Sequence, residues 1–99
     1  MENDIQKEEK VYVIYNFCTS TRKLWLSKQI KYWRKALEET INIINNEISS
    51  YNNIVNYFKI DYVKNDDIEE MLNNNQSFKV GTHIIGIKDI TPEKLVKNN

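Results

Sequence analysis

Residues 11–17 read Val-Tyr-Val-Ile-Tyr-Asn-Phe, and this stretch decides which class of fold the chain adopts. β-Branched and aromatic residues favour β-strands because their side chains pack well on a pleated surface. Apolar side chains occupy successive positions from Val11 to Tyr15, so both faces of the strand are apolar. A strand of this kind is typical of the centre of a sheet. The stretch therefore predicts a central strand that is covered on both sides.

A long amphipathic helix is predicted directly after this strand. Thr19, Ser20 and Thr21 are good N-cap residues, and neither Gly nor Pro follows for many positions. Apolar residues then recur in steps of three and four, which is the spacing of one helix face. They are Leu26, Ile30, Trp33, Leu37, Ile41, Ile44, Ile48, Tyr51 and Val55. The pattern predicts a helix from near Thr21 to near Ser50, which is roughly 30 residues or 45 Å long.

Shorter elements are predicted in the second half of the chain. Residues 57–63 are rich in aromatic and β-branched side chains and would form a second strand. Residues 67–72 would form a short helix with acidic residues in its first turn, where the helix dipole favours them. Residues 77–80 and 83–87 flank Gly81-Thr82 and would form a hairpin. Pro92 would begin a last helical turn.

These elements together predict an α+β fold, with a small mixed sheet of three to four strands packed against one long amphipathic helix and short helices. Residues 10–97 would form this single domain, after a flexible acidic tail at residues 1–9. The alternative is an all-helical hairpin or coiled coil, in which the strands expected at 57–63 and 77–87 do not form.

The composition indicates the class of protein, its cellular compartment and the type of genome that encodes it. The 99 residues include 40% hydrophobic and 28% charged residues, which is ordinary for a globular protein. The acidic, polar start is unlike a signal peptide, and no apolar run is long enough for a membrane span. The single cysteine indicates a reducing compartment, so a cytoplasmic protein is expected. The abundance of Asn, Ile and Lys is typical of an AT-rich genome, such as that of a virus, phage or parasite.

Charge is unevenly distributed along the chain, although the net charge is zero. Residues 22–35 carry six cations and no acid. On the expected helix, three of the lysines would share one face, and two aromatic residues would lie beside them. These five residues form the predicted partner-binding set: Trp25, Lys28, Lys31, Tyr32 and Lys35. Such a face suits a protein interface, and less well a nucleic acid, because zero net charge gives no long-range attraction for a polyanion. Packing within the domain is the third possibility.

The apolar helix face is longer than a small sheet covers. Its second half, with Ile41, Ile44 and Ile48, would then be exposed and would mark a homodimer or a larger protein partner. The alternative is a bend near Ser49-Ser50 that folds the end of the helix back onto the domain.

Two segments resemble the glutaredoxin branch of the thioredoxin-like fold. Residues 15–23 resemble the strand and the C-x-x-C or C-x-x-S/T motif of that family, with Cys18 first and Thr21 in the place of the second cysteine. Residues 81–90 resemble the family's last hairpin, which holds glutathione, and Gly86 and Asp89 match its pattern. Ile85 replaces the first glycine of that pattern, the cis-proline of the family is absent, and the expected first helix is about twice as long.

The resemblance implies Cys18 as the nucleophile of a monothiol reaction with glutathione, and otherwise no cofactor. A helix beginning just after Cys18 would also lower the pKa of its thiol. The alternative is that Cys18 is a small buried residue at the end of the strand. His83 and Cys18 could form a Cys–His nucleophilic pair, although no third residue that would orient the histidine is evident. The alternative is a packed or surface histidine in an apolar strand. One cysteine and one histidine do not make a metal site.

The sequence thus leaves two functions open. The first is a glutaredoxin-like protein that either acts without catalysis, by protein–protein interaction, or is a weak monothiol oxidoreductase. The second is a dimerising adaptor or inhibitor that binds a protein through the basic, aromatic helix face.

Overall fold

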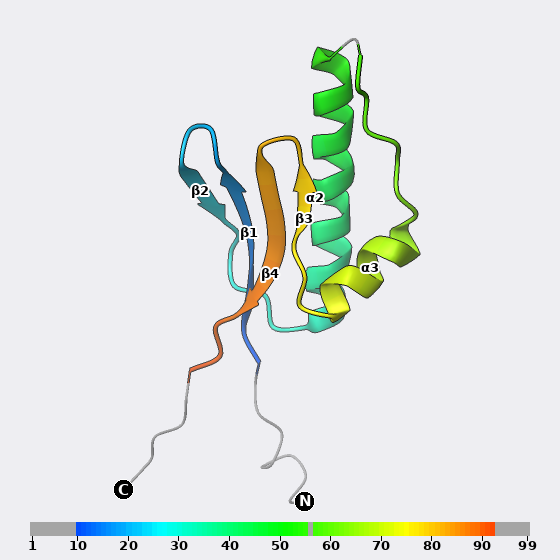
Figure 1. The fold of residues 1–99 in the computed structure, drawn as a ribbon. Coiled ribbons are helices and arrows are strands. Elements are labelled where there is room, and N and C mark those ends of the chain that lie inside the picture. The colour runs from blue at the N-terminus through cyan, green and yellow to red at the C-terminus, as the bar shows by residue number, and fades with distance from the viewer. Residues whose placement is uncertain (1–9, 56, 93–99) are drawn as a thin grey trace, which may run out of the picture.

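A computed structural model describes residues 10–55 and 57–92 and shows a four-stranded sheet with two helices (Figure 1). The order along the chain is β1 (Tyr12–Cys18), β2 (Lys23–Leu26), α2 (Trp33–Ile54), α3 (Asn65–Asn73), β3 (Phe78–Val80) and β4 (His83–Asp89). The α+β class predicted from the sequence is confirmed, and the described residues contain one short helix, α3. The last helical turn expected near Pro92 falls almost wholly outside the described residues.

The sheet has the strand order β2-β1-β4-β3, and each of its pairs is antiparallel. The prediction of a mixed sheet is therefore wrong, whereas the central place of residues 11–17 is confirmed. β1 pairs with β4 along its whole length, from Tyr12 opposite Asp89 to Cys18 opposite His83. Two hairpins, β1–β2 and β3–β4, thus meet in the middle of the sheet.

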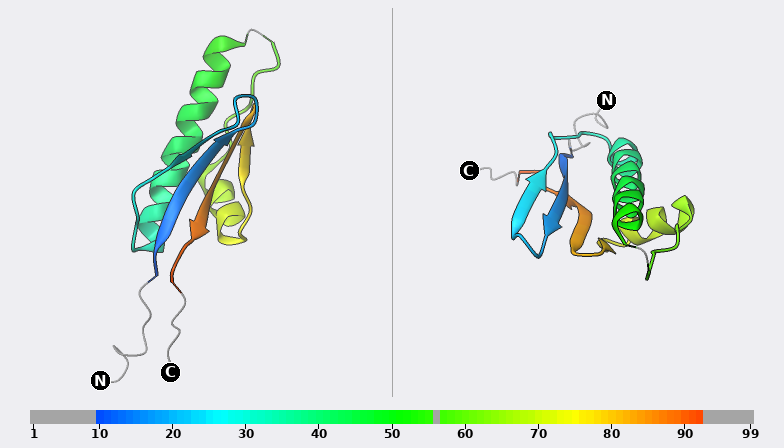
Figure 2. Two further views of the ribbon diagram at one scale, coloured as in Figure 1. Left: turned by 90° about the vertical axis from the view of Figure 1, so that its left-hand side faces the viewer. Right: turned by 90° about the horizontal axis from the view of Figure 1, so that it is seen from above.

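Both helices lie on the same side of the sheet (Figure 2). Side chains alternate between the two faces of a strand. In β1 and β4, Ile14 and Ile85 point to the helices and are completely buried. Phe78 of β3 and Leu37 of α2 belong to the same core cluster as Ile85. The core is therefore a single layer between the sheet and α2, with α3 closing one side.

The long helix begins at Trp33, not near Thr21, so the prediction for residues 21–32 is wrong. Residues 23–26 pair with β1, and Ile30 exchanges two backbone hydrogen bonds of 2.8 Å with Tyr12. A helix from Thr21 would carry Arg22 and Lys23 at its positive end, where cations are unfavourable. Pairing with the open edge of β1 satisfies the same backbone groups without that penalty.

The second half of α2 is core, not interface. Ile44 and Ile48 have no exposed surface, and Ile41 is 8% exposed. They pack against Ile68 and Leu72 of α3 and against the β3–β4 hairpin. The expectation that Ile41, Ile44 and Ile48 bind a partner is therefore wrong, because α3 and the hairpin occupy the space that a partner would need.

Residues 57–64 form no strand, contrary to the prediction for 57–63. The side-chain amide of Asn52 makes both hydrogen bonds of the Ile60 backbone, at 2.8 Å each. Phe58 has a positive φ of 60° and is 91% exposed. The segment is thus tied to α2 by the Asn52 side chain and by a hydrogen bond of 2.8 Å between the hydroxyls of Ser49 and Tyr62. It also packs Ile60 and Val63 onto the core.

The face of the sheet away from the helices has no covering layer among the described residues. Tyr15 and Phe17 of β1 are half-buried there, and Leu24 and Leu26 of β2 are exposed. The prediction that the central strand is covered on both sides is therefore correct for one side only.

We expect Ile44→Ala to lower the free energy of unfolding by about 2–5 kcal/mol, because it leaves a cavity under α3 and β3. Urea denaturation followed by circular dichroism measures this change. Ile54→Ala is the matched control, because Ile54 is 80% exposed on the same helix and should change stability by less than about 0.5 kcal/mol. Equal effects of the two substitutions would contradict the burial of this helix face.

Candidate functional site

The turns of the two hairpins lie side by side at one end of the sheet (Figure 1). The backbone N–H of Thr19 donates to the carbonyl oxygen of Thr82 at 2.8 Å, and the Thr19 hydroxyl donates to the same oxygen at 3.1 Å. The β3–β4 turn requires a positive φ of 59° at Gly81, where a Cβ would meet the ring of Tyr51 at 2.9 Å. These contacts place Cys18, the last residue of β1, next to Thr82.

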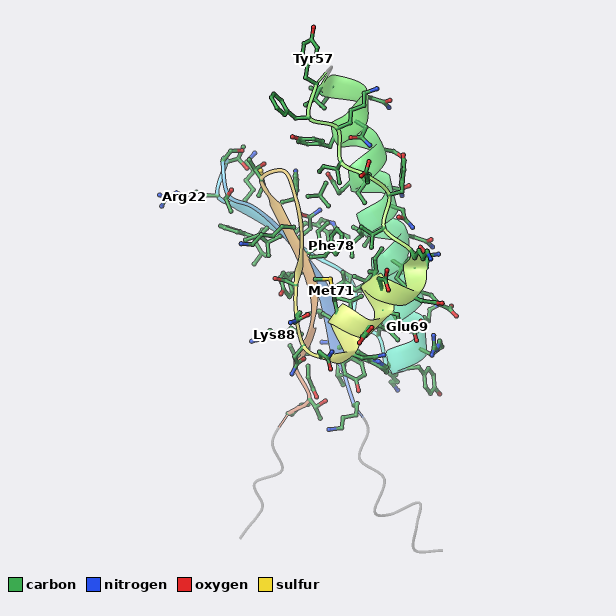
Figure 3. All side chains as sticks on the ribbon, turned by 45° about the vertical axis from the view of Figure 1, so that its right-hand side comes forward. Arg22, Tyr57, Glu69, Met71, Phe78 and Lys88 are labelled. Carbon is green, nitrogen blue, oxygen red and sulfur yellow. The ribbon has the colours of Figure 1, made fainter. Side chains whose placement is uncertain are left out.

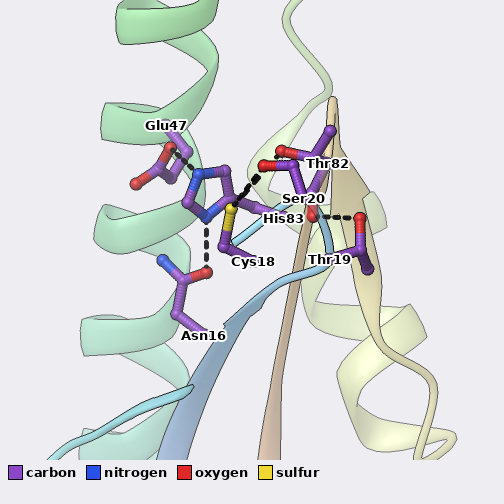
Figure 4. Close-up of polar contacts among 7 residues, drawn as sticks. All are labelled: Asn16, Cys18, Thr19, Ser20, Glu47, Thr82 and His83. Carbon is purple, nitrogen blue, oxygen red and sulfur yellow. Dashed lines mark hydrogen bonds and ion pairs between the residues drawn. The ribbon is translucent and has the colours of Figure 1, made fainter. Parts of the chain in front are cut away.

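The thiol of Cys18 is surrounded by hydroxyl groups (Figure 4). Its Sγ lies 3.2 Å from the Ser20 Oγ and 3.6 Å from the Thr82 Oγ1. Hydrogen bonds from the Ser20 hydroxyl, from the hydroxyl and N–H of Thr21 and from the Thr82 hydroxyl stabilise the thiolate and lower the pKa of Cys18 to about 6. The thiolate is therefore the favoured form of Cys18 near neutral pH.

The low pKa has a different cause from the one expected. The sequence predicted a helix N-terminus beside Cys18, but a four-residue turn, residues 19–22, follows Cys18 and α2 begins only at Trp33. Thr21, expected in the place of a second cysteine, lies in the turn after Cys18 and contributes to lowering the pKa of its thiol. Cys18 is half-buried and not fully buried, so the alternative of a buried structural cysteine is wrong.

His83 lies directly opposite Cys18 in the β1–β4 pair. Its Nδ1 is 2.8 Å from the Oδ1 of Asn16, and its Nε2 is 3.7 Å from the Oε1 of Glu47 (Figure 4). An amide oxygen only accepts, so Nδ1 carries the hydrogen. Both ring nitrogens therefore face residues other than Cys18, and the imidazole is not placed to take a proton from the thiol.

Sequence reasoning missed Asn16 and Glu47 as partners of His83. Asn16 lies two positions before Cys18, so strand alternation puts both side chains on one face. That signal was present in the sequence. The contact of Glu47 with His83 depends on how α2 packs across the sheet. A local sequence pattern does not predict this packing.

Gly86 and Asp89 lie away from Cys18. Gly86 pairs with Tyr15, whose ring covers the position that a Cβ would take. Asp89 pairs with Tyr12, six residues before Cys18, which is about 20 Å along the strand. The carboxylate of Asp89 also accepts a hydrogen bond from the Thr91 N–H at 2.8 Å. The residues that the resemblance assigns to glutathione are therefore not gathered around the thiol.

The basic and aromatic residues expected on one helix face are distributed over three elements. Trp25 lies in β2, Lys28 and Lys31 lie in the connection to α2, and Tyr32 is the N-cap residue of α2. Lys35 is in the first turn of α2 and makes an ion pair with Glu39 at 3.5 Å. The single helical binding face predicted from the sequence is therefore wrong.

The open face of the sheet carries a groove of about 570 Å³. Its walls are formed by residues of β1, β2 and β4 and by one residue of the loop before β3: Tyr15, Leu24, Leu26, Ile87, Lys88, Asp89 and Asn75. Leu24 is 57% and Leu26 is 52% exposed. The alternation of these two leucines was a strand signal in the sequence, but the helical spacing that also begins at Leu26 concealed it.

Within residues 10–55 and 57–92, no group of three His, Cys, Asp or Glu side chains could hold a metal ion. None of the helices described is long and apolar enough to cross a membrane. No protein-family model, curated protein or solved structure matches this chain.

We expect alkylation of Cys18 by iodoacetamide to follow a titration with a midpoint near pH 6, because only the thiolate reacts. Ser20→Ala combined with Thr82→Val removes two donors to the sulfur and should raise the midpoint above about 7. Thr19→Val removes a hydroxyl from the same turn that does not contact the thiol, so it should leave the midpoint near that of the unmodified chain. A midpoint of 8.5 or higher in the unmodified protein would contradict the hydrogen bonding described.

Proposed function

We propose that this chain is a protein-interaction module that binds its partner through the β1–β2 hairpin and the adjoining open face of the sheet. The observation that carries the proposal is the exposure of Leu24 and Leu26 beside a groove that they line with Tyr15. Contiguous apolar surface of this kind marks interaction sites in soluble proteins. Covering the exposed half of each leucine contributes roughly 1 kcal/mol.

A protein suits this surface better than a nucleic acid. The net charge of the chain is zero, so it gives no long-range attraction for a polyanion. Arg34 and Lys35, two of the six cations between residues 22 and 35, are already paired with Glu69 and Glu39. Tyr15, Leu24, Leu26 and Ile87 give the groove an apolar part, and Asn75, Lys88 and Asp89 give it a polar part. An apolar centre beside polar groups is the arrangement of protein interfaces.

Thiol–disulfide exchange at Cys18 is a second candidate function, and the low pKa of this half-buried thiol favours it. The thiolate would attack the glutathione sulfur of a glutathionylated thiol, form a mixed disulfide with glutathione and release the substrate thiolate. Reduced glutathione would then attack the mixed disulfide, regenerate the Cys18 thiolate and leave as oxidised glutathione. Glutathione would have to be held by groups near Cys18 other than Gly86 and Asp89, because the antiparallel pairing of β1 with β4 separates these two residues from the thiol. A thioredoxin-like origin of the fold belongs to the same proposal, and a reducing compartment such as the cytoplasm would keep the thiol free.

We expect the protein to stop binding its partner when Leu26 is replaced by a charged residue. Tagged protein carrying Leu26→Glu, expressed in the cells that naturally produce the chain, should recover the partner at least tenfold less than the unmodified protein, as measured by quantitative mass spectrometry. The physical reason is that a carboxylate in the groove must be desolvated when the partner covers it.

Ile54→Glu is the matched control, because it places the same charge on an equally large exposed side chain at the end of α2. This variant should keep the partner. Loss of the partner in Ile54→Glu and its retention in Leu26→Glu would place the interface at the end of α2 and contradict the proposal.

A further inference from the structure

We infer that the outer edge of β2 binds an acidic, extended segment of the partner protein, which adds to the sheet as a fifth strand beside Lys23–Leu26. This inference rests on the proposed function and names the kind of partner and its mode of binding. It is carried by three observations: a free strand edge, its surrounding charge and the side chains on its two faces.

The first observation is that β2 forms the accessible edge of the sheet. It is the outermost strand in the order β2-β1-β4-β3, and all four of its residues are exposed. The opposite edge strand, β3, is in contact with both α2 and α3 (Figure 2). An exposed edge strand presents unpaired N–H and C=O groups, which are a template for another strand.

The hydrogen bonds to β1 determine which groups of β2 are free. The N–H of Ser27 donates to the carbonyl oxygen of Ile14 at 2.9 Å. Alternate residues of a strand direct their backbone groups to opposite sides. Trp25 therefore bonds to β1 as Ser27 does, whereas Leu24 and Leu26 direct their N–H and C=O outward. These two residues offer two donors and two acceptors to an added strand.

The second observation is the positive charge around this edge. Arg22 precedes β2 at the tip of the hairpin (Figure 3), Lys23 is its first residue and Lys28 follows it. All three are exposed, and none of them makes an ion pair within the described residues. No acidic residue occurs between positions 19 and 37.

This charge argues against a second copy of the chain as the occupant. Two β2 strands paired with each other would bring two sets of the same cations together, and their repulsion would oppose the dimer. An acidic segment would instead be attracted along the same edge. Charge complementarity thus selects an acidic partner.

The third observation concerns the two faces of the edge. Leu24 and Leu26 face the open groove, whereas Lys23 and Trp25 face the opposite side. Side chains of an added strand would alternate in the same way. A segment with apolar residues at every second position and acidic residues between them would satisfy both faces.

Fluorescence anisotropy with the full chain tests the inference. The probe is a capped ten-residue peptide of alternating valine and glutamate, and its counterpart has lysine in place of glutamate. We expect the acidic probe to bind, the lysine peptide to bind at least tenfold more weakly, and the affinity for the acidic probe to fall with salt. Failure of the acidic probe to bind, or equal binding of both peptides, would overturn the inference.

Blocking the backbone separates strand addition from other modes of binding. Leu24→Pro removes an outward N–H that β1 does not use, and prolines are tolerated at such edge positions. It should weaken binding at least tenfold relative to Leu24→Ala, which loses the side chain but keeps the N–H. Equal binding of these two variants, with native circular dichroism in both, would overturn strand addition.

Two N-methylated probes give the same test without changing the protein. One is methylated at every valine and the other at every glutamate, so each removes the donors from one side of the extended peptide. Only one side can face β2, so one probe should lose binding and the other should keep it. Strand addition would be contradicted if both methylated peptides still bound, or if neither of them bound.

The outcomes also distinguish this inference from the proposed function. If Leu26→Glu loses the natural partner but Leu24→Pro keeps it, the open face of the sheet is the binding surface and strand addition is wrong. If Leu26→Glu keeps the natural partner, the proposed function itself fails.

Discussion

Backbone pairing between β1 and β2 is the interaction on which the rest of this structure depends. β1 has β4 on one side, and its other edge would expose a row of N–H and C=O groups in the middle of the domain. Residues 23–26 and Ile30 satisfy those groups. The same pairing takes these residues away from the helix, which begins at Trp33, and fixes its start beside Tyr12, whose ring centroid lies 5.2 Å from that of Trp33.

Two further features follow from this pairing. The chain has to turn back directly after Cys18, so the hydroxyl groups of the turn surround the thiol and lower its pKa. The new edge of the sheet is then β2 itself, with its leucines exposed and its cations around it. The thiol of lowered pKa and the proposed binding edge are thus consequences of one hairpin. The thiol lies next to the tip of this hairpin, and the binding edge is its outer strand.

Local signals predicted much of the fold. β1, α3 and the β3–β4 hairpin were found because each has a pattern that only one kind of element satisfies. Residues 21–32 were misassigned because Leu26, Ile30 and Trp33 have helical spacing, while Leu24 and Leu26 alternate as in a strand. The cations at positions 22 and 23 were the sign against a helix start. The strand expected at 57–63 failed because the amide of Asn52 binds Ile60 where a neighbouring strand would.

The site was less predictable than the fold. Cys18 and Thr21 were identified from the sequence and do lie together, but the donors Ser20 and Thr82 come from two different turns. The contact of His83 with Glu47 depends on strand register and helix placement, which are non-local. Gly86 and Asp89 were grouped with Cys18 by a short motif, and the antiparallel pairing of β1 with β4 separates them.

The central claim is that residues 23–26 form the exposed edge strand of a hairpin with β1. Nuclear magnetic resonance of the full chain tests it most directly. The claim predicts short Hα–Hα contacts between Phe17 and Leu24 and between Tyr15 and Leu26, with fast amide exchange at Leu24 and Leu26 and slow exchange at Trp25. Contacts between residues three apart along 22–32, which are typical of a helix, would contradict it.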